Sequence, residues 1–132
     1  MGKKLLKLFG YFLVFCFLTF SVYLLPVFAQ TREDAEKWLK TAKDTLALVE
    51  KTAGELVQGG IENIAQKDPA VKGEWESAKG WLSLAKEELK KAEDLCAKGK
   101  WDECSHSANW TWQLLVKCAT QAFNAGRAAG LK

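Results

Sequence analysis

The sequence has few of the residues that build metal centres and active sites. It contains one histidine, four cysteines and two prolines in 132 residues. No two cysteines have the C-x-x-C spacing of a structural zinc site, and there is no C-x-x-C-H motif for covalent haem. Gly59-Gly60 is an isolated turn signal and not a glycine-rich phosphate loop. We therefore expect no metal, no cofactor and no catalytic residue, and predict that the protein is not an enzyme.

His106, the only histidine, does not change this expectation. It follows Cys104 by two positions, and residues two apart on a helix do not face one another. A catalytic nucleophile also needs a base within hydrogen-bond reach and a group that orients the base. The serines and acidic residues are scattered at the spacing of a solvated helix surface, so no such arrangement is indicated.

Residues 1–29 have the three parts of a secretory signal. The first seven residues carry three lysines and no acid, residues 8–25 are almost wholly apolar, and Ala29 ends an A-x-A-like site before Gln30. Cleavage there would leave an exported helical domain, residues 30–132, in the periplasm or outside the cell. The alternative is an uncleaved anchor, because residues 8–25 just reach spanning length and would tether the domain to the membrane, facing outside.

The chain after residue 29 carries no net charge. All sixteen acidic residues lie there with sixteen of the nineteen basic ones, so the net charge of +3 belongs to the first segment. A neutral surface of mixed charge gives no electrostatic case for nucleic acid binding. The part after residue 29 keeps all six tryptophans and three cysteines but no tyrosine or methionine. Outside the cytosol, a pair of these cysteines can be oxidised.

Helix boundaries are marked by local signals. Thr31, with Asp34 three residues on, has the pattern of a capping box. Asp68-Pro69 is a strong helix start, because aspartate caps the helix and proline lacks only a donor that would be unpaired anyway. Gly59-Gly60 ends or kinks the first helix, and Gly99 provides a left-handed C-terminal cap for the second.

Three long helices follow from apolar positions that recur in steps of four and three. We predict helices over residues 31–58, 69–98 and 101–128, with a turn or two of helix at 61–67. Matched lengths and short connections predict an all-α fold, an antiparallel up-down-up three-helix bundle with shallow coiled-coil crossing.

The third helix has two apolar stripes. One is a seam of mostly small residues, and the second runs beside it through Trp112, Val116, Ala119 and Phe123. Because each helix of a three-helix core meets two neighbours, both stripes are expected to face the core. The seam consists of Trp101, Cys104, Ala108, Thr111, Leu115, Cys118, Ala122 and Ala125.

A disulfide between Cys96 and Cys104 is predicted from the register of the second and third helices. If both residues face the core at the hairpin, they are neighbours across the turn. Cys118 is about 21 Å from Cys104 along one helix and cannot join them within one molecule. It is either a buried cysteine that packs as a small hydrophobe or a functional or intermolecular thiol.

Four tryptophans flank the apolar seams: Trp38, Trp81, Trp110 and Trp112. They either widen the core or form an exposed aromatic patch for a lipid, a glycan or a partner protein. We predict a non-catalytic structural or protein-interaction module of the cell envelope with an unknown protein partner. The alternatives are a membrane-tethered bundle and a bundle that binds a small ligand or lipid through these tryptophans.

The turn between the second and third helices resembles a known pattern. Ala92, Leu95, Lys98-Gly99, Trp101, Cys104 and Ala108 reproduce the alanine and leucine ladder and Gly-x-aromatic turn of alanine-rich helical-hairpin domains in exported bacterial proteins of unknown function. The turn is also similar to that of tetratricopeptide hairpins, although the helices here are longer. The likeness covers about 30–40 residues and implies a scaffold without an activity.

Overall fold

The protein is described by a computed structural model that covers residues 30–131. Within this range the chain forms four helices and no strand, and 89% of the residues are helical, which confirms the all-helical prediction. The predicted signal with its apolar segment 8–25 and Ala29 lies outside the described residues. The helices are α2 (Arg32–Gln58), α3 (Ile61–Lys67), α4 (Pro69–Ala97) and α5 (Trp101–Ala128).

The helix ends form as the local signals predict. The Thr31 hydroxyl accepts from the Asp34 N–H and the Asp34 carboxylate accepts from the Thr31 N–H, which completes the capping box. The Asp68 carboxylate accepts from the N–H groups of the first turn of α4. Gly60 and Gly99 have φ angles of 89° and 73°, a left-handed conformation that favours glycine. Short-range hydrogen bonding therefore fixes where each long helix begins or ends.

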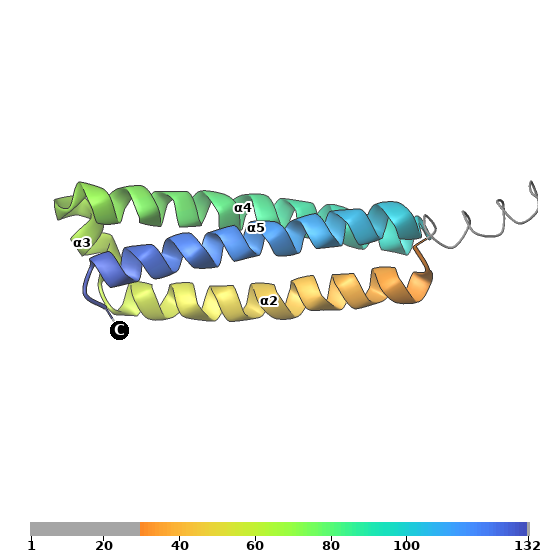
Figure 1. The fold of residues 1–132 in the computed structure, drawn as a ribbon, viewed down its shortest axis with the longest axis horizontal. Coiled ribbons are helices and arrows are strands. Elements are labelled where there is room, and N and C mark those ends of the chain that lie inside the picture. Colours follow the sequence, from red (N-terminus) through yellow and green to blue (C-terminus); the bar gives the residue numbers. More distant parts are fainter. Residues whose placement is uncertain (1–29, 132) are drawn as a thin grey trace, which may run out of the picture. The chain divides into compact units, whose positions relative to one another are not determined.

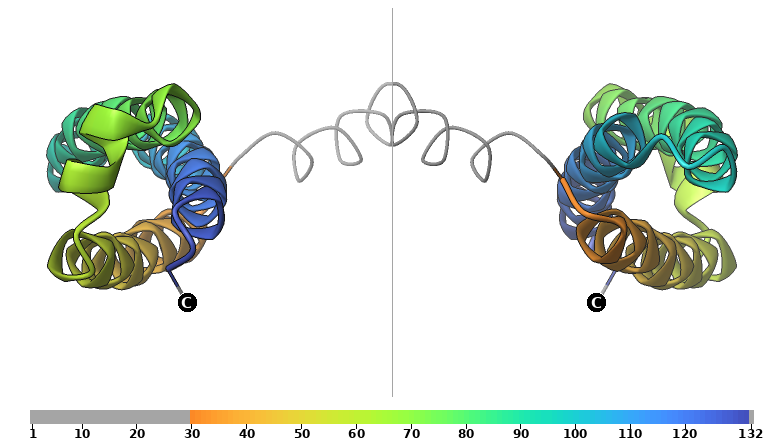
Figure 2. Two further views of the ribbon diagram at one scale, coloured as in Figure 1. Left: turned by 90° about the vertical axis from the view of Figure 1, so that its left-hand side faces the viewer. Right: turned by 90° about the vertical axis from the view of Figure 1, so that its right-hand side faces the viewer.

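The described residues form a helical bundle in which α2, α4 and α5 lie side by side (Figure 1). α2 and α5 run in the same direction and α4 runs in the opposite one. The short α3 crosses between the ends of α2 and α4, on the side away from α5 (Figure 2). The buried seams are rich in alanine, so the backbones approach closely. Larger side chains fill the core at Ile61, Val71, Trp75, Leu114 and Leu115.

Trp75 attaches α3 to α4. Its ring is 2% exposed, and its indole N–H donates to the Glu62 carboxylate at 2.8 Å. The Lys79 ammonium pairs with Glu76 at 2.9 Å and with Glu62 at 3.5 Å. The hydrogen bond from Lys79 to Glu76 is the main cause of a raised lysine pKa, and the nearby Glu62 charge adds to it. The polar tip of a buried tryptophan thus has a partner, as burial requires.

Candidate interaction face

Formal charge is distributed unevenly over the three long helices. α2 and α4 each carry eleven charged residues, at positions spread along their whole length. On α5 the charged residues are Asp102 and Glu103 in the first turn, then Lys117 and Arg127. The outer side of α5 is instead lined by amide, hydroxyl and apolar side chains. Depletion of charge is one of the compositional marks of a protein interface.

The second stripe of α5 is exposed, so the expectation that it faces the core is wrong. Phe123 is 65% exposed, Val116 43% and Trp112 36%, and Ala119 between them is also exposed. The flank of α5 that is buried is the opposite one, where Ser107 and Leu114 lie under α4.

The second stripe of α5 is exposed because the neighbouring helix α2 does not cover it. At the level of the stripe, α2 presents Thr45, Thr52 and the 64% exposed Leu48, and none of these reaches far enough to cover α5. Periodicity identifies an apolar stripe, but it does not show whether a neighbouring helix covers it. We call the surface formed by Leu48, Trp112, Val116, Ala119 and Phe123 the α2–α5 face.

The threonines along the α2–α5 face offer no free hydroxyl donor. Thr45, Thr52 and Thr120 each donate the side-chain hydroxyl to the backbone carbonyl four residues earlier, at 2.8–3.1 Å. Because the hydroxyl hydrogens are used within their own helices, the groove between α2 and α5 presents mainly the threonine methyl groups and the apolar side chains beside them. Such a lining suits an apolar occupant.

Two adjoining cavities lie along this groove. One of 270 Å³ is lined by Leu48, Val116 and Ala119 among others, and one of 340 Å³ by Leu56, Phe123 and Gly126 among others. Both have Thr52 and Ala122 in their lining, so the two cavities adjoin one another along the α2–α5 seam.

α2 and α5 approach closely at one end of this groove, near Gly126. A Cβ built on Gly126 would lie 2.8 Å from Cδ2 of Leu56.

The four flanking tryptophans form two pairs on opposite sides of α5. Trp38 of α2 and Trp112 of α5 have ring centroids 6.1 Å apart and rings tilted by 57°. Trp81 of α4 and Trp110 of α5 both lie beside the Lys117 ammonium, which is 4.7 Å from the centroid of the first ring and 5.4 Å from that of the second. This is a cation–π arrangement in which the chain's own lysine contacts both rings. Only the first pair adjoins the α2–α5 face.

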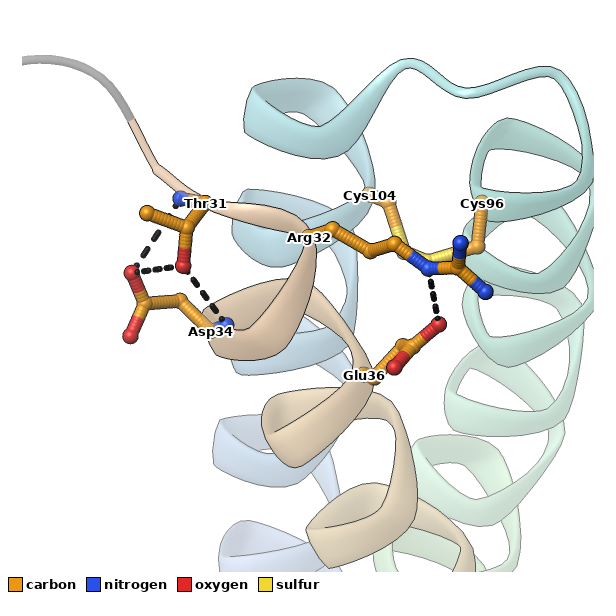
Figure 3. A network of polar contacts seen from close by, with 6 residues as sticks. All are labelled: Thr31, Arg32, Asp34, Glu36, Cys96 and Cys104. Atoms are coloured by element: carbon orange, nitrogen blue, oxygen red, sulfur yellow. Dashed lines mark hydrogen bonds and ion pairs between the residues drawn. A yellow bond between two sulfur atoms is a disulfide. The ribbon is translucent and has the colours of Figure 1, made fainter.

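The hairpin end of the bundle is closed by the cysteine pair. Cys96 and Cys104 lie at disulfide distance with Cα atoms 5.2 Å apart, so their predicted proximity is confirmed. Figure 3 shows this pair beside the start of α2, where the Arg32 side chain pairs with Glu36 at 2.7 Å. The Arg32 guanidinium also lies 5.5 Å from the centroid of the Trp101 ring.

The remaining reactive residues form no assembled centre among residues 30–131. Cys118 is free and 1% exposed, and desolvation raises the pKa of its thiol. His106 is exposed and its Nδ1 lies 2.7 Å from the Asp102 carbonyl, while the Ser107 hydroxyl donates to Glu88 at 2.5 Å. In the same range no group of histidine, cysteine and carboxylate side chains is arranged to hold a metal ion.

None of the described helices has the length and apolar character needed to cross a membrane. The predicted tether through residues 8–25 lies outside the range in which this was assessed. Comparison with known proteins finds no matching family model, no matching curated protein and no matching solved structure.

Proposed function

We propose that this chain is a non-catalytic structural or protein-interaction module of the cell envelope, and that it docks through the α2–α5 face. The observation that carries the proposal is the exposure of Leu48, Trp112, Val116 and Phe123 on the side of the bundle where α5 has little charge. Aromatic enrichment with charge depletion is the signature of an interface core, and contiguous exposed apolar patches mark interaction sites.

The proposal treats α2, α4 and α5 as an antiparallel up-down-up three-helix bundle and residues 1–29 as its export signal. The matched lengths of these helices support the bundle. The Cys96–Cys104 pair supports export, because disulfides persist in oxidising compartments. A scaffold role also agrees with the resemblance of the hairpin turn to exported helical domains. An uncleaved anchor would hold the same bundle at the membrane, and N-terminal sequencing that starts at Gln30 would remove that alternative.

Native electrophoresis of envelope fractions tests the proposal. We expect the full chain to migrate in an assembly larger than a monomer, and Phe123→Glu to release it as a monomer. Leu84→Glu is a matched control, because Leu84 is 48% exposed on α4 and lies away from the α2–α5 face. Monomeric migration of the unmutated chain, or equal behaviour of the two variants, would show that the face is not used.

A further inference from the structure

The outer side of α2 carries a row of charges that would meet opposite charges on an antiparallel copy of the same helix. Lys40, Asp44, Leu48, Lys51 and Glu55 are spaced by three or four residues and therefore lie along one side of the helix. Their order is positive, negative, apolar, positive, negative. Read backwards, every charged position takes the opposite sign. Two α2 helices packed antiparallel about Leu48 would thus place Lys51 opposite Asp44, and Glu55 opposite Lys40.

The spacing of the exposed stripe of α5 is also the same in both chain directions. Trp112, Val116, Ala119 and Phe123 follow in steps of four, three and four, which read the same in either direction. Antiparallel packing about the midpoint would place Trp112 against Phe123 of a second copy, and Val116 against Ala119. The second contact sets a large side chain against a small one. The basic residue nearest this midpoint, Lys117, is turned toward Trp81 and Trp110 on the α4 side.

The two midpoints lie at the same level along the bundle. Leu48, the centre of the α2 pattern, lines one cavity together with Val116 and Ala119, which flank the centre of the α5 stripe. Because α2 and α5 run in the same direction, one rotation by 180° reverses both helices at once (Figure 1). A single two-fold axis across the groove at this level therefore satisfies both patterns, and a twofold-symmetric interface is the commonest in soluble oligomers.

We infer that the occupant of the α2–α5 face is a second copy of this chain, packed antiparallel about an axis close to Leu48. This inference rests on the proposed function and names the partner. Two helices about 40 Å long and about 10 Å apart present roughly 800 Å², which is the area that each partner contributes to a standard interface. The two lysines and two acids of this α2 row leave it without net charge, so it offers an anionic bilayer no net attraction, whereas a second copy supplies an opposite charge at each of the four positions.

Charge reversal followed by sedimentation equilibrium tests the inference. The full chain is expressed with residues 1–29 encoded, and the protein is purified as the cell has processed it, with or without cleavage after Ala29. Lys51→Asp sets like charges against Asp44 twice in each dimer, so we expect the dimer dissociation constant to rise about tenfold. The double variant Asp44→Lys/Lys51→Asp should recover most of the lost affinity, because each reversed charge again meets its opposite in the second copy. Recovery is not complete, because the variant loses the ion pair between Lys40 and Asp44 within each helix. Residues seven apart on one helix make no such pair within a copy, so rescue reports contact between copies.

Two further variants separate folding from association. Leu48→Glu places two carboxylates near the axis and should weaken the dimer at least about 30-fold, while circular dichroism remains unchanged because Leu48 is exposed. Lys90→Asp, at an exposed position of α4, should leave the dissociation constant unchanged. A monomer at all concentrations up to about 100 µM, or a dimer indifferent to Leu48→Glu, would overturn the inference.

A photo-crosslinking amino acid at Val116 separates this inference from the proposed function. An adduct of twice the chain mass supports the second copy. An adduct with a different protein overturns the second copy but leaves the docking function standing. An adduct with lipid, or none, overturns both.

Discussion

Removal of the Cys96–Cys104 bond should lower stability by an amount that the loop length sets. The two cysteines are eight residues apart, and closing a loop of this size removes about 2.5 kcal/mol of chain entropy from the unfolded state. For a domain of about 100 residues, this corresponds to a fall of about 10–20 °C in the midpoint of thermal unfolding. The short loop makes this one of the smaller stabilisations that a native disulfide gives.

The assay is thermal unfolding followed by circular dichroism at 222 nm, with and without reductant. The double variant Cys96→Ala/Cys104→Ala should match the reduced unmutated chain apart from the loss of two sulfur atoms, of which the Cys104 sulfur is in a fully buried residue. Reductant should have no effect on the double variant, which controls for Cys118. Thiol counting in denaturant should find two more thiols after reduction than before. A midpoint that reduction shifts by less than about 2 °C would show that the Cys96–Cys104 bond does not stabilise the bundle.

Three further predictions concern single residues. Gly80→Ala should raise the free energy of unfolding in denaturant by about 0.5–1 kcal/mol, because the added Cβ meets no atom within 4 Å. Gly126→Ala should not show this gain, because the added Cβ would crowd the Leu56 side chain. Equal gains from the two variants would contradict the close packing at Gly126. Cys118 should react with a thiol reagent far more slowly in the native than in the unfolded protein, because burial raises its pKa, and equal rates would contradict its burial. The pKa of Asp34 is lowered by hydrogen bonds from the side-chain hydroxyl and backbone N–H of Thr31. The ionised Asp34 therefore stabilises the fold above about pH 4, and this contribution is lost as the pH falls through the lowered pKa of the folded state. An Asp34→Asn variant whose helicity has the same acid dependence as the unmutated chain would contradict this.

The helix boundaries were predictable because the responsible interactions are local. Thr31 with Asp34, and Asp68 before Pro69, satisfy backbone donors within a few residues. Gly99 adopts the left-handed conformation of the turn without strain, so no distant contact is needed to hold the turn. The proximity of Cys96 and Cys104 was also predictable, because the hairpin between them fixes the register of two adjacent helices.

The α2–α5 face was not predictable, because it depends on where neighbouring helices stop covering one another. Trp112 and Phe123 have the spacing of core residues, and only the position of α2 leaves them exposed. Leu48 is an isolated apolar residue on the outer side of α2, and no sequence pattern pointed to it. One of the two interpretations of the flanking tryptophans placed Trp81 and Trp110 in the same patch as Trp112. The helical phase of α5 separates them from Trp112, and the Lys117 ammonium lies against both of their rings.

Site-specific photo-crosslinking in living cells tests most directly whether the α2–α5 face is the docking surface. The crosslinking amino acid replaces Phe123 in one full-length variant and Leu84 in the other, two exposed apolar positions on different faces. We expect a discrete protein adduct from position 123 and none from position 84. Adducts of equal yield from both positions, or no protein adduct from position 123, would contradict it.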